Sequence, residues 1–473
     1  MNRHSKLLTD LYELTMLAGY LEQGLADQPA VFDLFFRTNP FEGGYAVFAG
    51  LEPALEAVER QTIAPAELEY LAGLGLFQDR FLEFLGALRF RGRISAPPEG
   101  TLVFANEPLV TVEGTLAEAQ LVETTLLTLL NFQTLVATKA ARVCRAAAGA
   151  EVIEFGLRRA QGPDGGLSAA RAAAIGGCVG TSNVLAGMAY GMPVKGTHAH
   201  SWVQAFPDEL TAFRAYAEAF PDGTILLVDT YDTLESGIPN AIVVARELRA
   251  RGHELRGIRI DSGDLAYLSR QGRRLLDEAG FPQVRIVASN DLDEHVIESV
   301  RHEGGQVDVY GVGTRLVTGA GSGGGALGGV YKLVSIGGQP TLKVTGDAAK
   351  TTLPGNKRVF RAVDDHGRFL QDIIGLVEER PAAGEPVFHP INPMQHTRIA
   401  AGARLTELRE VVMERGHRTR AREGLAAMAE RCRAGLAALP EGCTRLINPH
   451  LYKVSISVGL NDLKSRLIAK GAH

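Results

Sequence analysis

The chain has 473 residues, of which 45% are apolar and 22% charged, and its formal net charge is −5 at pH 7. That length exceeds what one ordinary hydrophobic core fills, so two or three domains are expected, and the charge excludes an overall basic field that would attract nucleic acid. No apolar run approaches the roughly 18 residues of a membrane helix, no signal core opens the chain, and four cysteines lack paired spacing, which favours a reduced cytoplasmic enzyme.

Residues 1–130 are predicted to form an α+β domain. A helix with a cap at Thr9 or Asp10 begins the chain, and Tyr12 inside it has the position of an ordinary core residue. A buried strand is expected over 30–37, helices over 52–90, and short strands over 91–116. A long helical pattern then leads toward the centre of the chain.

The central region, residues 151–314, contains short apolar runs that each stop at small and polar residues. Six such runs begin at Val152, Met192, Ile225, Ile258, Ile286 and Val307. Buried parallel strands in βα units have this pattern, so residues 131–330 are predicted to form an α/β barrel with the catalytic site. An open doubly wound sheet would give the same local pattern.

In a barrel, the carboxyl ends of the strands meet at one rim, where the chemistry takes place. The polar residues expected at this rim are Arg158, Gly196-Thr197-His198-Ala199-His200-Ser201, Asp229, Asp261 and Gly313-Thr314. Hydroxyl, carboxylate, imidazole and glycine residues at one rim predict a site for a polyanionic, hydroxylated ligand. The roles of Arg158, Asp229 and Asp261 rest on strand-end position alone, and each could instead belong to a structural ion pair.

His198 and His200 lack the further ligands of a zinc site. We interpret His198 as a packed ring, whereas His200 could be packed or functional. Arg259 lies inside an apolar strand, where a buried cation needs an anion, either Asp261 or a substrate carboxylate. The rim carboxylates Asp229 and Asp261 would suit Mg²⁺ that bridges a diphosphate.

Residues 331–473 follow a glycine-rich stretch at 319–329. A hairpin is expected around Gly337-Gly338, then a basic loop over 350–358 that could contact phosphate. The arginine-rich stretch from Leu405 to about Leu439 is predicted to be a pair of amphipathic helices on the surface. A strand or loop at 448–455 could return to the rim.

The ordered motifs along the chain resemble the nicotinate phosphoribosyltransferase family. They are Thr9 to Met16, Asn39-Pro40-Phe41, Glu154 to Gly166, Gly196 to Ser201, Asp261-Ser262-Gly263-Asp264, Gly311 to Thr314 and Asn448-Pro449-His450. The resemblance runs through nearly the whole length. It implies an irregular TIM-like barrel of the type II phosphoribosyltransferase kind, with an α+β domain formed from both chain ends.

The same resemblance implies an activity. The family transfers phosphoribosyl from 5-phospho-α-D-ribose 1-diphosphate to nicotinate, giving nicotinate mononucleotide and diphosphate in the salvage route to NAD. ATP hydrolysis is coupled to this ligase-like glycosyl transfer through a phosphohistidine, which matches His200 here. Tyr12, Thr197 and Arg259 would line the nicotinate site, and Thr314, with Gly313 and Arg158, the phosphoribosyl diphosphate site. Mg²⁺ and a homodimer are also implied.

Nicotinamide phosphoribosyltransferase is a near relative that has an aspartate in a Gly-Thr-Asp segment. Here the matching segment reads Gly180-Thr181-Ser182-Asn183. A carboxylate at this position would repel nicotinate, whereas the Ser182 hydroxyl can donate a hydrogen bond to it. Nicotinate is therefore the expected substrate.

Two alternatives come from other classes of protein. An aldolase or lyase on the same barrel would need a Schiff-base lysine or a dense metal triad, and Lys195 is the only lysine near a strand end. A binding protein that has lost its chemistry would have damaged motifs, yet His200, Arg259 and Thr314 are all present.

Overall fold

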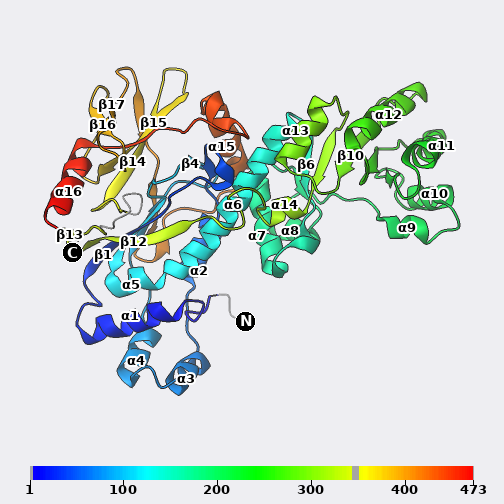
Figure 1. Cartoon of the computed structure of the whole chain (residues 1–473). Coiled ribbons are helices and arrows are strands. Elements are labelled where there is room, and N and C mark those ends of the chain that lie inside the picture. Colours follow the sequence, from blue (N-terminus) through cyan, green and yellow to red (C-terminus); the bar gives the residue numbers. More distant parts are fainter. Residues whose placement is uncertain (1–3, 344–350, 472–473) are drawn as a thin grey trace. The chain divides into compact units, whose positions relative to one another are not determined.

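The computed structural model describes residues 4–343 and 351–471. It contains two compact units (Figure 1). Unit 1 combines residues 1–135 with 322–473, and unit 2 comprises residues 136–321. The sequence placed these boundaries at 130/131 and 330/331. Unit 1 thus takes its residues from both ends of the chain, and unit 2 from the middle.

The helices of unit 1 lie mainly in its N-terminal part. They are α1 (Leu11–Glu22), α2 (Leu51–Glu59), α3 (Pro65–Gly73), α4 (Asp79–Ala87), α5 (Leu116–Leu121), and then α15 (Leu425–Ala438) and α16 (Val458–Ala469). The helix α1 follows Asp10 as its N-cap, as predicted. The helix α6 (Glu123–Ala147) contains the boundary between the units at 135/136.

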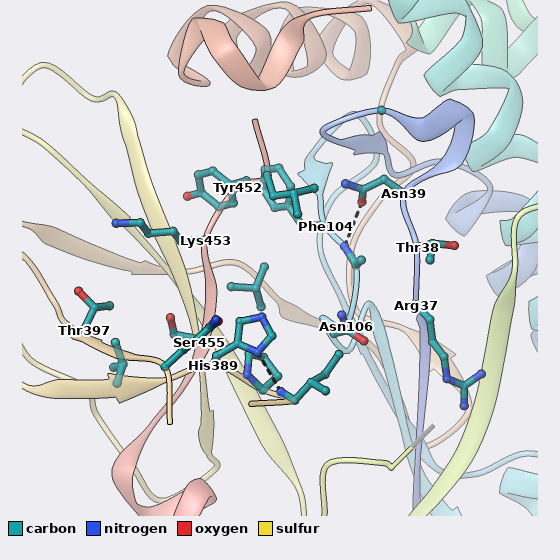
Figure 2. A pocket seen from close by; sticks show the side chains of 18 of the residues that line it. Arg37, Thr38, Asn39, Phe104, Asn106, His389, Thr397, Tyr452, Lys453 and Ser455 are labelled. Atoms are coloured by element: carbon teal, nitrogen blue, oxygen red, sulfur yellow. Dashed lines mark hydrogen bonds between the residues drawn. The ribbon is translucent and has the colours of Figure 1, made fainter. Parts of the chain in front are cut away.

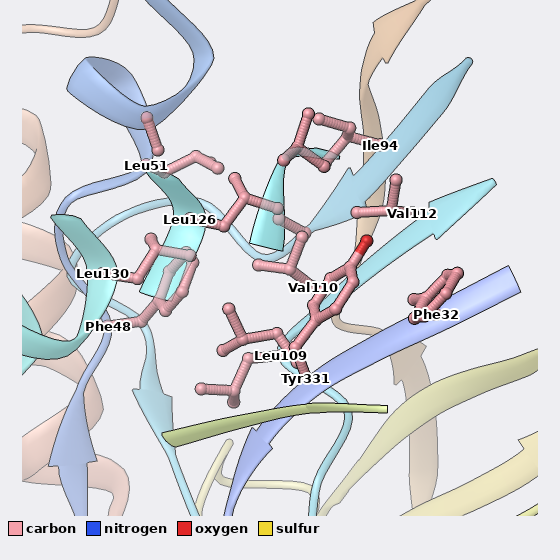
Figure 3. Close-up of a cluster of buried hydrophobic side chains, with 14 of the residues drawn as sticks. Phe32, Phe48, Leu51, Ile94, Leu109, Val110, Val112, Leu126, Leu130 and Tyr331 are labelled. Atoms are coloured by element: carbon pink, nitrogen blue, oxygen red, sulfur yellow. The ribbon is translucent and has the colours of Figure 1, made fainter. Parts of the chain in front are cut away.

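A seven-stranded sheet forms the centre of unit 1, in the order β13-β12-β1-β5-β3-β19-β20. Its strands are β1 (Pro29–Phe36), β3 (Arg93–Ala96), β5 (Val110–Thr115), β12 (Gly329–Ile336), β13 (Gln339–Pro340), β19 (Glu410–Glu414) and β20 (His417–Arg418). Figure 3 shows the apolar cluster on this sheet, where Phe32 stacks on Tyr331 at 4.8 Å between ring centroids. Leu51 of α2 and Leu126 of α6 belong to the same cluster. Burial of these apolar side chains joins the N-terminal segment to the returning chain.

A second sheet of six strands completes unit 1, in the order β17-β16-β21-β15-β14-β18. The strands are β14 (Lys357–Val363), β15 (Phe369–Leu376), β16 (Pro386–Phe388), β17 (His396–Arg398), β18 (Arg404–Glu407) and β21 (Val454–Ile456), and a separate short pair is formed by β2 (Ala46–Val47) and β4 (Leu102–Val103). The closing segment at 448–455 therefore ends in a strand of unit 1, paired with β15.

The predicted helix pair from Leu405 to Leu439 is wrong in its first half. Residues there form β18, β19 and β20, and only α15 is helical. The apolar spacing resembles a helix, but Val412 and Met413 become fully buried when β19 pairs with β3, which lies about 300 residues earlier in the sequence. A partner strand so distant leaves no local signal.

The basic loop predicted over 350–358 also differs from the structure. Lys350 lies outside the described residues, while Lys357 and Arg358 begin β14. The Lys357 ammonium is 1% exposed and forms an ion pair with Asp33 at 2.8 Å. Since Lys357 is satisfied inside unit 1, it is not a solvated phosphate-binding residue.

Unit 2 consists of parallel strands followed by helices. Its strands are β6 (Glu151–Glu154), β7 (Gly180–Thr181), β8 (Ile225–Leu227), β9 (Gly257–Ile260), β10 (Arg285–Ser289) and β11 (Val309–Val312). Its helices are α7 (Gly162–Ile175), α8 (Val184–Tyr190), α9 (His200–Gln204), α10 (Glu209–Ala219), α11 (Ile238–Ala250), α12 (Leu265–Glu278), α13 (Glu294–His302) and α14 (Thr314–Val317). This alternation confirms the predicted βα units.

The strand order of unit 2 is β7-β6-β11-β10-β9-β8. This is the cyclic succession of a barrel, but among the described residues no ladder joins β7 to β8. The run at Met192 was predicted as a strand and makes only one bridge, from Val194 to Thr181. The sequence missed β7 as a strand because two residues, Gly180 and Thr181, carry no apolar run.

One helical stretch, Leu116–Ala147, has the length and mean hydropathy, 1.2, of a membrane-spanning segment. The sequence pattern had indicated no such segment. Most of its apolar window, 61%, is buried inside the protein, as in the core helix of a globular protein.

Candidate functional site

A cavity of about 410 Å³ lies at the carboxyl ends of the parallel strands of unit 2. Six predicted site residues line it, namely Arg158, Thr197, Arg259, Asp261, Gly313 and Thr314. Phe155, Ser182, Ser289, Asn290 and Asp291 also line it. The prediction that strand-end residues converge on one rim is confirmed, because these residues lie at or just beyond the carboxyl ends of β6, β7, β9, β10 and β11, and Thr197 follows the bridge at Val194.

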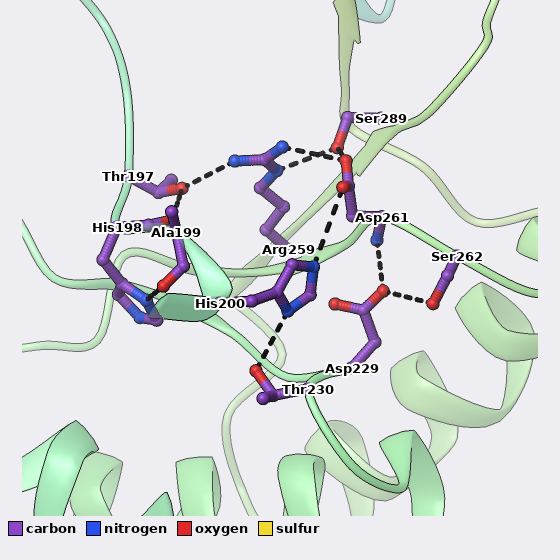
Figure 4. A network of polar contacts seen from close by, with 10 residues as sticks. All are labelled: Thr197, His198, Ala199, His200, Asp229, Thr230, Arg259, Asp261, Ser262 and Ser289. Carbon is purple, nitrogen blue, oxygen red and sulfur yellow. Dashed lines mark hydrogen bonds and ion pairs between the residues drawn. The ribbon is translucent and has the colours of Figure 1, made fainter. Parts of the chain in front are cut away.

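Arg259 lies at the centre of a hydrogen-bond network (Figure 4). Its Nε donates to Ser289 Oγ at 2.8 Å, and its Nη1 donates to Thr197 Oγ1 at 3.1 Å. Its Nη2 donates to Asp261 Oδ1 at 2.8 Å, which confirms the predicted pairing with the residue two positions on. Ser289 in turn donates to Asp261. The network fixes the guanidinium in one orientation at the cavity wall.

The aromatic ring of Phe155 adds an apolar face beside this cation. The guanidinium carbon of Arg259 lies 5.6 Å from the Phe155 ring centroid. A Cβ at Gly311 would lie 2.5 Å from the same ring, so only glycine leaves room for Phe155 there. In the sequence, Phe155 is only the last residue of an apolar strand, and that pattern gives no sign that its ring lines the cavity.

His200 is the first residue of α9 and is 39% exposed. Its Nδ1 lies 3.1 Å from Thr230 Oγ1, and its Nε2 lies 3.8 Å from Asp261 Oδ2. Figure 4 shows the ring between these two partners. His200 therefore contacts the Arg259 network through Asp261, although it does not itself line the cavity.

His198 is a packed ring, as predicted. Its Nε2 accepts the backbone N–H of Leu227 at 3.2 Å, and its Nδ1 lies 3.3 Å from the carbonyl oxygen of Ala199. Tyr216 contacts the ring edge-on at 4.7 Å between centroids. Burial lowers the pKa of His198 to about 4. The imidazole is therefore neutral near pH 7, with both nitrogens in use.

Asp229 supports the loop that follows β9. Its Oδ2 accepts from the Asp261 backbone N–H at 2.9 Å and from Ser262 Oγ at 2.6 Å. Its Oδ1 is buried and has no hydrogen-bond partner. Within residues 4–343 and 351–471, no three His, Cys, Asp or Glu side chains form a metal cluster. The free Oδ1 fits Mg²⁺ only if a phosphate-bearing substrate supplies further oxygens, which is how this ion is commonly held.

Glu154 lies in β6, below the rim, and was not among the predicted site residues. Its carboxylate accepts from Thr181 Oγ1 at 2.6 Å and from the backbone N–H of Gly156, while its carbonyl oxygen accepts from the Ser182 N–H at 2.9 Å. Burial raises the pKa of Glu154 above its usual value. This one side chain therefore positions two lining segments, those that follow β6 and β7.

Two lining residues carry unusual backbone angles. Asn290 has φ of 94° and Asp291 has φ of 30°, in a region that side-chain-bearing residues rarely adopt. Asparagine and aspartate tolerate it best. An asparagine followed by an aspartate at the end of β10 therefore suits a strained turn of the backbone at the cavity.

Tyr12 belongs to unit 1, on α1. It is 47% exposed, and its hydroxyl donates to Glu123 Oε1 at 3.1 Å. The expectation that Tyr12 is an ordinary core residue is therefore wrong. Its exposed ring follows from its place on the solvent side of α1, opposite the buried Leu14 and Leu17.

Three family models match successive parts of the chain. The nicotinate phosphoribosyltransferase (NAPRTase) N-terminal domain matches residues 7–131, the NAPRTase family matches 150–367, and the C-terminal domain matches 356–464. Together they cover most of the sequence.

Relatives and a solved structure agree with these models. The nicotinate phosphoribosyltransferase of Bacillus subtilis is 45% identical over 87% of this chain and 84% of its own length. The nicotinate phosphoribosyltransferase of Dictyostelium discoideum is 40% identical over 96% of this chain and 87% of its own length. The crystal structure of human nicotinic acid phosphoribosyltransferase superimposes with a TM-score of 0.87 at 34% identity, covering 97% of this chain and 99% of that one. The chain belongs to the nicotinate phosphoribosyltransferase family.

Proposed function

We propose that this protein is a nicotinate phosphoribosyltransferase, which transfers 5-phosphoribosyl from 5-phospho-α-D-ribose 1-diphosphate to nicotinate. The products would be nicotinate mononucleotide and diphosphate, in a salvage route to NAD. The observation that carries the proposal is the oriented Arg259 guanidinium beside the Phe155 ring in the cavity of unit 2. A planar aromatic carboxylate is complementary to both groups.

Arg259 keeps donors available for a substrate carboxylate. A guanidinium carries five N–H groups, and the network with Ser289, Thr197 and Asp261 uses three of them. The remaining N–H groups can donate to nicotinate. Thr197 would contact the same substrate, and Tyr12 is a further proposed contact.

The phosphoribosyl diphosphate would lie near Arg158, Gly313 and Thr314, which line the same cavity. In the reaction the pyridine nitrogen of nicotinate attacks C1 of the ribose, and the bond from C1 to the diphosphate oxygen breaks. Negative charge then grows on the leaving diphosphate, where the Arg158 guanidinium would stabilise it. Mg²⁺, held in part by Asp229 and with Asp261 nearby, would supply further charge neutralisation.

The coupling to ATP would use His200. If its Nδ1–H donates to Thr230, then Nε2 carries the free lone pair that attacks the γ-phosphorus of ATP, and ADP leaves. The added phosphoryl charge would lie beside Asp261 and disturb its pairing with Arg259. This offers a route from phosphorylation to substrate affinity. If ATP leaves the apparent affinity for both substrates unchanged, the coupling proposal is contradicted.

Ser182 supports nicotinate over nicotinamide as substrate. It lines the cavity together with Arg259. Its hydroxyl can donate to a carboxylate, whereas an aspartate in its place would repel one. A strong nicotinamide activity of the pure protein would overturn this preference.

Three further expectations complete the proposal. The sheet of unit 2 would be an irregular TIM-like barrel, which its cyclic strand order supports. The protein would act in the cytoplasm and form a homodimer. Sedimentation equilibrium measures the dimer directly, and a mass of one chain at all concentrations would contradict it.

The activity is tested by incubating labelled nicotinate with 5-phospho-α-D-ribose 1-diphosphate, Mg²⁺ and the pure protein. We expect nicotinate mononucleotide and an equal amount of diphosphate. A parallel reaction with nicotinamide should give far less product. If neither base is converted, the proposed function fails although the family membership stands.

A further inference from the structure

Unit 1 contains a cavity of about 820 Å³, larger than the cavity of unit 2 (Figure 2). Figure 2 shows Arg37 and Lys453 on opposite sides of it, with their charged ends pointing apart. The stacked rings of Phe104 and Tyr452 are 2% and 9% exposed and present no open face. The two cations therefore do not converge on one ligand. In the cavity of unit 2 the polar groups do converge, and a buried carboxylate holds two of the segments that carry them.

That carboxylate, Glu154, is bonded to a buried hydroxyl on the neighbouring strand. Glu154 and Thr181 are register partners in the parallel pair of β6 and β7, and they are 1% and 0% exposed. Glu154 Oε2 accepts from Thr181 Oγ1 at 2.6 Å. The same Oγ1 accepts from the backbone N–H of Asn183 at 2.9 Å. The Thr181 hydroxyl thus connects the carboxylate to the residue that caps α8.

Ser182, which lines the cavity, lies between these contacts. Its own N–H donates to the carbonyl oxygen of Glu154 at 2.9 Å, and the next N–H along the chain, that of Asn183, donates to Thr181 Oγ1. The Asn183 side chain accepts in turn from the Ala186 N–H at 3.1 Å. Because the peptide groups on both sides of Ser182 are held, the direction of its side chain at the cavity is held as well.

The second carboxylate oxygen of Glu154 holds the turn that carries Arg158. Its Oε1 accepts from the backbone N–H of Gly156, directly before the turn Leu157–Arg159. A Cβ at Gly156 would lie 2.5 Å from the Cβ of Val317, so the chain passes there only as glycine. Glu154 therefore supports Ser182 through Thr181, and the Arg158 turn through Gly156.

From these contacts we propose that Glu154 and Thr181 are positioning residues that set the preference for nicotinate over nicotinamide. They hold the Ser182 hydroxyl where it donates to the carboxylate of the base, so the inference rests on the proposed function. A hydrogen bond weakens steeply when its distance and angle depart from the optimum, so a small shift of Ser182 is enough to weaken the contact. Thr181 acts on the base alone, whereas Glu154 acts on both substrates.

The test compares kinetics of the full-length protein with nicotinate and with nicotinamide. Thr181→Val keeps the branched shape and removes the hydroxyl. We expect it to raise KM for nicotinate about three- to tenfold, with kcat and the KM for phosphoribosyl diphosphate nearly unchanged. The ratio of kcat/KM for nicotinate to that for nicotinamide should fall by the same factor. Thr181→Ser, which keeps the hydroxyl, should retain the wild-type ratio.

Glu154→Gln is the second variant. The amide nitrogen cannot accept a hydrogen bond, so one of the two contacts of the carboxylate is lost. We expect this variant to lower the same ratio and to raise the KM for phosphoribosyl diphosphate as well. It tests the proposal independently of whether Thr181→Val folds, which thermal unfolding checks for every variant.

Thr224→Val is the matched control. Thr224 is also 0% exposed, and its hydroxyl donates to the carbonyl oxygen of Phe220 at 2.6 Å, at the amino end of β8 and away from the cavity. This variant should lose stability and keep the wild-type ratio. A wild-type ratio in both Thr181→Val and Glu154→Gln, or an equal loss of activity with both bases, would overturn the inference alone. A wild type that converts neither base would overturn the proposed function and the inference with it.

Discussion

Two charged networks in this molecule are built from the same residue types and differ in what they leave free. In unit 1, Arg361 donates to both carboxylate oxygens of Asp372, at 2.9 and 2.6 Å, and the two side chains are 5% and 0% exposed. In unit 2, Arg259 and Asp261 are 15% and 26% exposed and lie at the wall of a cavity. The first network is closed to solvent, and the second is open to a ligand.

This difference teaches how to separate structural ion pairs from candidate site residues. The remaining donors of Arg361 meet the Leu102 carbonyl oxygen at 2.8 Å and the faces of Phe104 and Phe369. Arg259 meets two hydroxyls, one carboxylate and the ring of Phe155, with the cavity in front of it. We therefore expect changes in the first network to alter stability, and changes in the second to alter activity.

The largest expected effect comes from Asp372→Asn. The amide leaves the Arg361 cation buried without its anion, which costs about 3–5 kcal/mol of unfolding free energy. Urea unfolding followed by circular dichroism measures it. The matched change at the rim, Asp261→Asn, should lower the unfolding free energy by less than about 1 kcal/mol, because that pair is partly exposed. Equal losses for the two variants would contradict the contrast.

The second expected effect is on the pH dependence of the unfolding free energy, to which His198 contributes. Its pKa is about 4 when folded and about 6.5 when unfolded, so the unfolded chain binds the extra proton. The contribution of His198 to the unfolding free energy is complete above pH 6.5. It is lost as the pH is lowered toward 4, by at most about 3 kcal/mol. His198→Gln, whose amide oxygen can still accept the Leu227 N–H, should remove this part of the pH dependence. An unchanged slope between pH 4 and 6.5 in the variant would contradict a buried neutral imidazole.

The third expected effect is on catalysis. Arg259→Ala should lower kcat/KM for nicotinate by about 10- to 100-fold, since it would remove the proposed charge-assisted contact with the substrate carboxylate. Its unfolding free energy should change little. Arg249→Ala, which removes an exposed arginine paired with Glu254 in the same unit, is the control. Steady-state product formation gives both values, and equal rates for the two variants would argue against Arg259 as the nicotinate contact.

The smallest expected effect is on specificity. Ser182→Asp should shift the ratio of kcat/KM for nicotinate to that for nicotinamide by roughly tenfold toward nicotinamide, through repulsion of the carboxylate. Ser182→Asn, of similar size without the charge, should shift it less. Competition between the two bases in one reaction measures the ratio directly.

The sequence predicted the rim of unit 2 well because its signals are local. Most of the strands are followed within a few positions by polar residues, so Thr197, Asp261 and Thr314 could be placed at one edge before any contact was known. The alternation of side chains along a strand made Asp261 one of the two partners predicted for Arg259, the other being a substrate carboxylate. His198 could be recognised as a packed ring, although its hydrogen bond to Leu227 could not.

What the sequence could not provide depends on distant partners. The strand β19 pairs with β3 across about 300 residues, and the buried pair of Asp33 with Lys357 spans a similar distance. Phe155 becomes a lining residue only because Gly311 on the neighbouring strand leaves space for its ring. Such contacts follow from tertiary packing and carry no local pattern.

We propose that ATP-coupled phosphoribosyl transfer to nicotinate takes place in the cavity of unit 2. The most direct test measures nicotinate mononucleotide formation with and without ATP for the wild type, His200→Ala and His253→Ala, the last a surface histidine paired with Asp222. We predict that ATP accelerates the wild type and His253→Ala, and that His200→Ala keeps a basal rate without this response. A wild type that forms no product, or a His200→Ala variant that still responds to ATP, would contradict the account.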